Sequence, residues 1–221
     1  MKITENNLFH NINESEQQEM MHCFNTFKKS YHAGEIILFY DEDDKGIGIL
    51  EKGEACVIHV NDAGNRTILE HLSEGEIFGQ LFYYYAGKEN ITVEAVTNCE
   101  IRYIDFEHIV KRCSKACAHH SQLVNNILLM VSDKTQSICE HLEVLSQRTI
   151  RERLMTYFEI LAAQEGKQSF VLPFTMSALA DYLSVDRSAM SRELSKMKEE
   201  GLIQIEKKKV TICKKNKDGF S

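Results

Sequence analysis

The stretch TMSALADYLSVDRSAMSRELSKMKEEGLI, residues 175–203, decides the fold of the second half of the chain. It is typical of two short helices joined by a tight turn at Ser184 and Val185. Asp186 stands where an N-cap belongs, because its carboxylate can accept a free backbone N–H of the next turn, and Gly201 ends the second helix. Apolar residues recur at helical spacing in both helices. They are Leu179, Tyr182 and Leu183 in the first helix, and Met190, Leu194 and Met197 in the second.

The other face of the second predicted helix is rich in hydrogen-bond donors. It carries Arg187, Ser188, Ser191, Arg192 and Lys196. An ordinary helical hairpin has the same apolar pattern, so the donor-rich face is what favours a helix-turn-helix, whose second helix lies in the DNA major groove. The following LIQIEKKKVTI forms two short β-prone runs around Lys207, Lys208 and Lys209. These runs predict a hairpin wing whose lysines reach phosphates.

The composition limits the class of protein. With 221 residues, 43% of them hydrophobic, the chain fits one large or two small folded domains. No run approaches the roughly 20 apolar residues of a membrane span, and the N-terminus is too polar for a signal peptide, so we expect a cytoplasmic protein with no membrane partner. The net charge of −7 is uneven: residues 1–147 hold 12 Lys and Arg against 23 Asp and Glu, whereas residues 148–221 hold 14 against 10. The basic second half suits DNA.

The first half of the chain has a β pattern. Eight of the eleven glycines fall between Gly34 and Gly87, where they separate short β-prone runs, and the turn-rich stretch 61–65 predicts a hairpin loop. Regularly spaced short strands predict a small antiparallel barrel or roll. The expected strands are 35–40, 47–51, 54–60, 66–72, 91–97 and 99–104.

A long helix is expected from about residue 106 to 145. Its middle carries a heptad seam with spacings that alternate four and three, at Val124, Leu128, Val131, Thr135, Ile138, Leu142 and Leu145. This seam predicts a parallel coiled-coil homodimer, although packing onto the chain's own roll would also bury it. Thr149 and Glu152 form a capping-box pair, so we expect the long helix to break at residues 146–148 and a new helix to run over about 150–163.

The order of roll, long seam helix, hinge and winged helix-turn-helix resembles the CRP/FNR superfamily of transcription regulators over nearly the whole chain. The resemblance is most specific in DRSAMSRELSKMKEEGLI at 186–203 and EGEIFGQL at 74–81, and LSQRTIRERL at 145–154 is similar to the start of the family's DNA-domain helix. It implies an α+β fold with an N-terminal antiparallel β-roll of the double-stranded β-helix or jelly-roll kind, similar to cyclic-nucleotide-binding domains. The domains expected are an effector-sensing roll over 1–108, a long dimerisation helix and hinge over 109–147, and a winged helix-turn-helix DNA-binding domain over 148–221.

The resemblance also implies a dimeric regulator gated by a small-molecule effector, with double-stranded DNA and RNA polymerase as partners. The residues implied for DNA are Arg187, Ser188, Ser191 and Arg192 toward base edges, and Thr175 and Lys196 toward phosphates. Ser191-Arg192 resembles the Ser-Arg pair of the fumarate–nitrate branch, whereas Arg187 matches an arginine used in the cyclic-AMP branch, so the operator follows from neither. An arginine can bond guanine O6 and N7 together, a contact worth about 1–3 kcal/mol in discrimination.

An effector pocket is implied by the same resemblance. Its residues would be Gly79, Gln80, Leu81, Lys88, Asn90 and Thr92. In the family's cyclic-AMP pattern a glutamate follows the glycine, and an Arg-Ser or Arg-Thr pair binds the phosphate. Here Gln80 follows Gly79, and no arginine stands between Arg66 and Arg102. A cyclic phosphate would lose its bidentate partner, so we expect an effector other than cyclic AMP. The aromatic run at 82–85 either lines a pocket for a small organic ligand or belongs to the core.

Two cysteines leave a second function open. Cys113 and Cys117 lie four residues apart on the predicted long helix, and an iron–sulfur cluster, haem, metal or redox disulfide there would make a redox- or metal-responsive regulator with the same DNA output. A structural role for both is the simpler interpretation, so no metal is expected, and the seven scattered cysteines are expected to be reduced thiols. An enzyme ranks last, because the sequence has no Gly-rich phosphate loop, nucleophile motif or metal-spaced His/Glu cluster.

Overall fold

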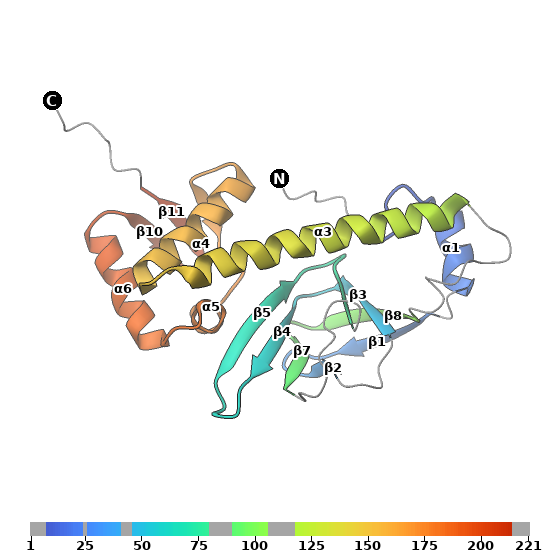
Figure 1. The fold of residues 1–221 in the computed structure, drawn as a ribbon, viewed down its shortest axis with the longest axis horizontal. Coiled ribbons are helices and arrows are strands. Elements are labelled where there is room, and N and C mark those ends of the chain that lie inside the picture. The colour runs from blue at the N-terminus through green and yellow to red at the C-terminus, as the bar shows by residue number, and fades with distance from the viewer. Residues whose placement is uncertain (1–7, 24–25, 41–45, 80–89, 106–117, 214–221) are drawn as a thin grey trace. The chain divides into compact units, whose positions relative to one another are not determined.

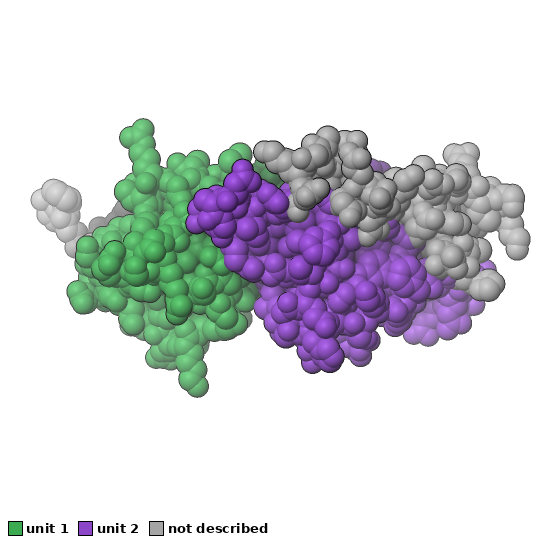
Figure 2. All heavy atoms as spheres, turned by 90° about the horizontal axis from the view of Figure 1, so that it is seen from below, with its two compact units in different colours: residues 1–2, 136–221 green, residues 3–135 purple. Residues whose placement is uncertain are grey.

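The structure, a computed structural model, describes residues 8–23, 26–40, 46–79, 90–105 and 118–213. The chain forms two compact units, residues 3–135 and residues 136–221 together with the first two, which Figure 2 shows in purple and green. Each unit has its own sheet structure and its own buried apolar residues. The division into three functional domains at 108 and 147 stays a prediction.

The first unit contains two four-stranded antiparallel sheets, which together we call the roll (Figure 1). One sheet has the strand order β1-β8-β3-β6 and the other has the order β2-β7-β4-β5. The strands are β1 Phe27–Tyr31, β2 Ile36–Phe39, β3 Gly46–Lys52, β4 Ala55–Val60, β5 Arg66–Leu72, β6 Ile77–Gly79, β7 Ile91–Ala95 and β8 Cys99–Asp105. All six strands predicted from the sequence are confirmed.

The sequence pattern does not predict three elements of this unit. In β1, which lies at a sheet edge, only Tyr31 is buried, so the strand shows no apolar alternation. The strand β6 is three residues long and buried throughout. The helix α1, Glu14–Cys23, is mostly polar and begins with a local cap: Asn13 Oδ1 accepts from Glu16 N at 2.9 Å, and Glu16 Oε2 accepts from Asn13 N at 3.1 Å.

The interior of the roll is filled by apolar side chains from both sheets. Leu50, Leu72, Phe78 and Val93 are fully buried in this cluster. A Cβ on Gly48 would come within 2.3 Å of the Phe78 ring, so the glycine makes room for that ring. Close packing of this kind leaves little freedom for a larger residue at the same place.

A second cluster covers the other face of the β1-β8-β3-β6 sheet. It joins Ile47, Ile49, Ile77 and Ile104 of the sheet to Leu8, Ile12 and Met20 near the N-terminus and to Leu123 and Met130 of the long helix α3. The buried Asn126 of α3 adds a polar tie, because its Nδ2 donates to the carbonyl oxygens of Leu8 at 3.0 Å and His10 at 2.8 Å. The chain before α1 therefore binds the start of α3 to the roll.

The helix α3 runs from Ala118 to Ser146, and the predicted part before residue 118 lies outside the described residues. It begins in the first unit and ends in the second, since the units divide after Thr135. One stripe of the helix is buried at Leu123, Asn126, Met130, His141 and Val144. Most of the predicted seam is exposed: the relative exposure is 39% for Val124, 63% for Leu128, 59% for Ile138 and 66% for Leu142, whereas Val131 and Leu145 are half-buried.

The second unit has three more helices and a three-stranded sheet of order β10-β11-β9. Its elements are α4 Ile150–Glu165, β9 Ser169–Val171, α5 Met176–Leu183, α6 Arg187–Glu199, β10 Ile203–Glu206 and β11 Lys209–Ile212. The predicted break before α4 is confirmed together with its capping box, in which Thr149 Oγ1 accepts from Glu152 N at 3.2 Å and Glu152 Oε2 accepts from Thr149 N at 3.0 Å. The two helices and the hairpin wing are confirmed as well, and only β9 is not predicted.

Gly79 provides a direct test of the packing between β3 and β6. It has a φ of +125°, and a Cβ there would lie 2.4 Å from the carbonyl oxygen of Gly46. Gly34 has a φ of +88° with nothing within 4 Å of its Cβ position, so Gly34→Ala is the matched control for backbone strain alone. We expect Gly79→Ala to lower the free energy of unfolding of the roll by about 1–3 kcal/mol more than Gly34→Ala, measured by urea unfolding of the full chain. Equal losses would show that the close approach of β3 and β6 is wrong.

Candidate nucleic-acid interface

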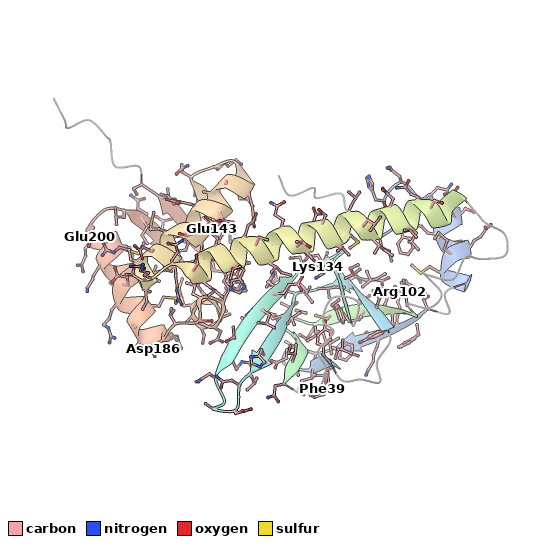
Figure 3. The ribbon with its side chains drawn as sticks, in the orientation of Figure 1. Phe39, Arg102, Lys134, Glu143, Asp186 and Glu200 are labelled. Carbon is pink, nitrogen blue, oxygen red and sulfur yellow. The ribbon has the colours of Figure 1, made fainter. Side chains whose placement is uncertain are left out.

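Local hydrogen bonds set the start of each helix of the helix-turn-helix, α5 and α6. Thr175 caps α5, where its Oγ1 accepts from Ala178 N at 3.2 Å. Ser184 ends α5 in the left-handed conformation, with a φ of 51°. Asp186 caps α6 as the sequence predicts, because its Oδ1 accepts from Ala189 N at 2.8 Å. Figure 3 labels Asp186 and Glu200 at the two ends of α6.

The inner faces of α5 and α6 are held by apolar packing. The buried residues are Leu179, Ala180 and Leu183 of α5, and Met190, Leu194 and Met197 of α6. An aromatic group lies beside them, in which the ring of Tyr182 is 5.2 Å from that of Tyr157 and 4.9 Å from that of Phe174. Six buried side chains spread over both helices fix which side of α6 faces away from the unit.

The outward side of α6 presents the residues implied for DNA. Arg187, Ser188, Ser191, Arg192 and Lys196 are all exposed, and so is Thr175 at the start of α5. Arg187, Ser188, Ser191 and Arg192 fall within the first two turns of α6, the part of a recognition helix that comes nearest the base edges. The structure therefore brings the predicted base-facing residues together on one exposed surface. Their roles toward DNA stay predictions.

One contact on this surface restricts the chemistry of Ser188. Its Oγ donates to Asp186 Oδ1 at 2.5 Å, and this bond and the bond from Ala189 N hold the pKa of Asp186 below its usual value, with a further contribution from the charge of Arg192. Because its hydroxyl hydrogen is committed to a carboxylate, Ser188 offers only acceptor lone pairs to a ligand. Among base edges in the major groove, the amino groups of adenine N6 and cytosine N4 are the donors that would match.

Two arginines of α4 connect the helix-turn-helix to the rest of its unit, and the sequence pattern does not single them out. Arg153 Nη1 donates to the carbonyl oxygen of Leu183 at 2.9 Å. Arg151 pairs with Glu193 and Glu200 of the α6 region. These three partners lie 30 to 49 residues further along the chain, so no local pattern could have found them.

The wing lysines lie at a turn of the β10–β11 hairpin. Lys207, with a φ of 56°, and Lys208 connect β10 to β11, and Lys209 begins β11. All three are exposed. The carbonyl oxygen of Lys208 accepts from Leu172 N at 2.8 Å, which holds the turn onto the segment before α5.

Only part of the implied effector pocket can be placed. Gln80, Leu81, Lys88 and the aromatic run at 82–85 lie outside the described residues. Gly79 is buried and its N–H donates to the hydroxyl of Tyr40 at 3.1 Å. Thr92 occupies the face of β7 opposite Ile91 and Val93, which pack inside the roll, and its hydroxyl lies 3.3 Å from Glu94 Oε1. Asn90 precedes β7 and its carbonyl oxygen accepts from Val60 N. The side chain of Thr92 is only 9% exposed on that face, and the roles of Gly79, Asn90 and Thr92 toward an effector stay predictions.

The metal and redox alternative depends on two cysteines whose structure is not described. Cys113 and Cys117 lie outside the described residues. Within the described ranges, Cys56, Cys99, Cys139 and Cys213 are free thiols, and burial raises the pKa of Cys56 to about 12, which makes it unreactive. No group of three His, Cys, Asp or Glu residues in those ranges is arranged to hold a metal ion. No helix of the described part is both long enough and apolar enough to cross a bilayer.

Two family models match the chain, one for each half. The model for the cyclic nucleotide-binding domain matches residues 28–115, and the model for the Crp-like helix-turn-helix domain matches residues 152–217. The chain is also 24% identical over 200 residues to the transcriptional activator protein FnrL of Cereibacter sphaeroides, a match that covers 84% of this chain and 76% of that protein.

Solved structures show the same fold. FixK2 from Bradyrhizobium japonicum superposes with a TM-score of 0.64 at 19% identity, covering 86% of this chain and 93% of that one. The c-di-GMP responsive global regulator CLP of Xanthomonas campestris superposes with a TM-score of 0.70 at 15% identity, covering 90% and 100%. At these identities the solved structures support only the fold, which is an antiparallel roll followed by a helix-turn-helix domain.

Proposed function

Because this chain belongs to the CRP/FNR superfamily of transcription regulators, a family of DNA-binding proteins rather than enzymes, we propose that it works as an effector-gated homodimer that reads a two-fold symmetric DNA site. The observation that carries the DNA-binding part is the surface of α6, where four polar side chains, Arg187, Ser188, Ser191 and Arg192, stand exposed in the first two turns, away from the buried stripe. We place its action in the cytoplasm, with RNA polymerase as its protein partner.

In this proposal Arg187 and Arg192 read bases, and Ser188 selects a base that donates. Thr175 and Lys196 hold phosphates at the edges of the surface, and the wing lysines add general affinity. The Thr175 hydroxyl accepts a bond from Ala178 N, which leaves its hydrogen to donate to a phosphate oxygen. Every residue in this proposal lies between the cap of α5 and the wing, so recognition needs no other segment of the chain to contact DNA.

The exposed seam of α3 supports the dimer. Four large apolar side chains, Val124, Leu128, Ile138 and Leu142, stand at least 39% exposed along a single stripe, although another stripe of the same helix is buried. Their four-and-three spacing suits a second copy of the helix, which would remove the stripe from water. A parallel pair would give the two α6 helices the two-fold relation that a symmetric operator needs.

The effector is proposed to act from the roll through α3. In the first unit, Lys134 of α3, which Figure 3 labels, pairs with Glu70 of β5, and both side chains are at most 16% exposed, so a shift of β5 would act on the helix. The missing arginine and Gln80 disfavour cyclic AMP. Mass spectrometry of the small molecules released from purified protein would identify the effector.

The dimer is tested with Ile138→Lys. Two like charges would meet in an apolar seam, so we expect monomers by light scattering at concentrations where the wild-type chain is dimeric. Ser137→Lys, which adds the same charge at an exposed position outside the seam, is the control and should stay dimeric. A dimer in both variants would show that another surface joins the copies.

Base reading is tested with Arg192→Ala on a selected operator and on a scrambled duplex. We expect a loss of about 1–3 kcal/mol on the operator and little loss on scrambled DNA, because the arginine is proposed to bond a base edge. Changing Lys207, Lys208 and Lys209 together to Ala should weaken both duplexes alike and reduce the slope of the salt dependence by up to about one unit for each phosphate that the wing no longer neutralises. If Arg192→Ala weakens both duplexes equally, the arginine binds phosphate and the proposed groove contact is wrong.

A further inference from the structure

One arginine of α4 pairs with two carboxylates at and beside the recognition helix. Arg151 Nε lies 2.5 Å from Glu193 Oε1, and its two terminal nitrogens lie 2.6 and 2.8 Å from the two carboxylate oxygens of Glu200. The contact to Glu200 is a bidentate fork, the strongest arrangement between these groups. Glu193 and Glu200 are seven residues apart and so share one flank of the helix, next to the buried stripe.

These ion pairs are not what holds α6 in place. Met190 and Met197 are fully buried and Leu194 is 6% exposed, so apolar packing already fixes the rotation of α6. The side chains of Arg151 and Glu200 are 36% and 43% exposed, and an ion pair this open to water adds little to stability. The distinct contribution of Arg151 must then lie in charge rather than in folding.

The net charge of α6 and its caps bears on how Arg151 affects DNA binding. Residues 186–200 contain four cationic residues, Arg187, Arg192, Lys196 and Lys198, and four anionic residues, Asp186, Glu193, Glu199 and Glu200. Taken alone, the helix and its caps are therefore electrically neutral, which is a poor surface for a polyanion. The wing lysines are proposed to supply positive charge beside the helix, and the carboxylates of the helix must be kept away from the phosphates.

We infer that Arg151 is a positioning residue for DNA binding: it holds the carboxylates of Glu193 and Glu200 on the flank of α6, away from the phosphate backbone that they would repel. Arg151 does not itself contact DNA in this role, and its effect does not depend on sequence. The inference rests on the proposed function, in which the outward side of α6 faces DNA.

The test is a mutant cycle built from Arg151→Gln, the double variant Glu193→Gln with Glu200→Gln, and the triple variant. Binding is measured on the selected operator and on the scrambled duplex in low salt. We expect Arg151→Gln to weaken binding to both duplexes by the same factor, roughly ten-fold, because uncovered carboxylates repel any phosphate backbone. The triple variant should bind within about two-fold of the double variant, since no carboxylate is left for Arg151 to hold away from DNA.

Other outcomes overturn the inference. If Arg151→Gln weakens the operator much more than the scrambled duplex, the arginine orients α6 for base reading. If the loss is the same in the wild-type and carboxylate-free backgrounds, the arginine binds phosphate directly. No loss in Arg151→Gln shows that the carboxylates do not face DNA. In each case the wild-type chain still prefers its operator, whereas failure of the proposed function would appear as a wild-type chain with no operator preference.

The control variant is Arg66→Gln, which removes an arginine from an ion pair of the same type in the roll. Arg66 Nη2 lies 2.9 Å from Glu94 Oε2. The change in net charge equals that of Arg151→Gln, but the site lies on β5 of the other compact unit. Arg66→Gln should leave binding to both duplexes within about two-fold of wild type, and a ten-fold loss there would make net charge the cause and overturn the role of Arg151. Thermal unfolding of every variant separates loss of binding from loss of fold.

Discussion

The two stripes of α3, one buried and one exposed, are the constraint on which the cores of both units depend. A helix of 29 residues buries Leu123 and Met130 against the roll in the first unit and Val144 in the second, so both units rely on it for part of their core. The same helix leaves a second stripe of large apolar residues in water, which is costly unless another surface covers it. The proposal of a dimer follows from this imbalance.

The sequence predicts well those elements of the structure that local signals specify. The six strands, the break before α4, the caps at Thr149 and Asp186, and the two helices of the DNA-binding domain all follow from periodicity, glycine placement and capping chemistry within a few residues. The strands β1, β6 and β9 lie beyond such signals because pairing with distant partners stabilises them: β1 with β8, β6 with β3 and β9 with β11. Their own three to five residues carry no clear alternation.

The same limit applies to the site. The exposed donors of α6 could be predicted from helical spacing, but not the bond that commits the Ser188 hydroxyl to Asp186, because it depends on a side-chain rotamer. The pairing of Arg151 with Glu193 and Glu200 joins residues 42 and 49 positions apart and depends on how α4 packs on α6. In the roll, the resemblance groups Thr92 with Gly79, and the alternation of β7 puts the buried Thr92 side chain on the face opposite Val93 of the interior cluster.

The central claim is that two copies of α6 read the major groove of one duplex. Dimethyl sulfate modifies guanine N7 in that groove, so protection from it on an operator selected with the wild-type chain is the most direct measurement. The account predicts two sets of protected guanines, related by two-fold symmetry and centred about 10 base pairs, or a multiple of one helical turn, apart. A single set of protected guanines, or binding without any protection of guanine N7, would contradict it.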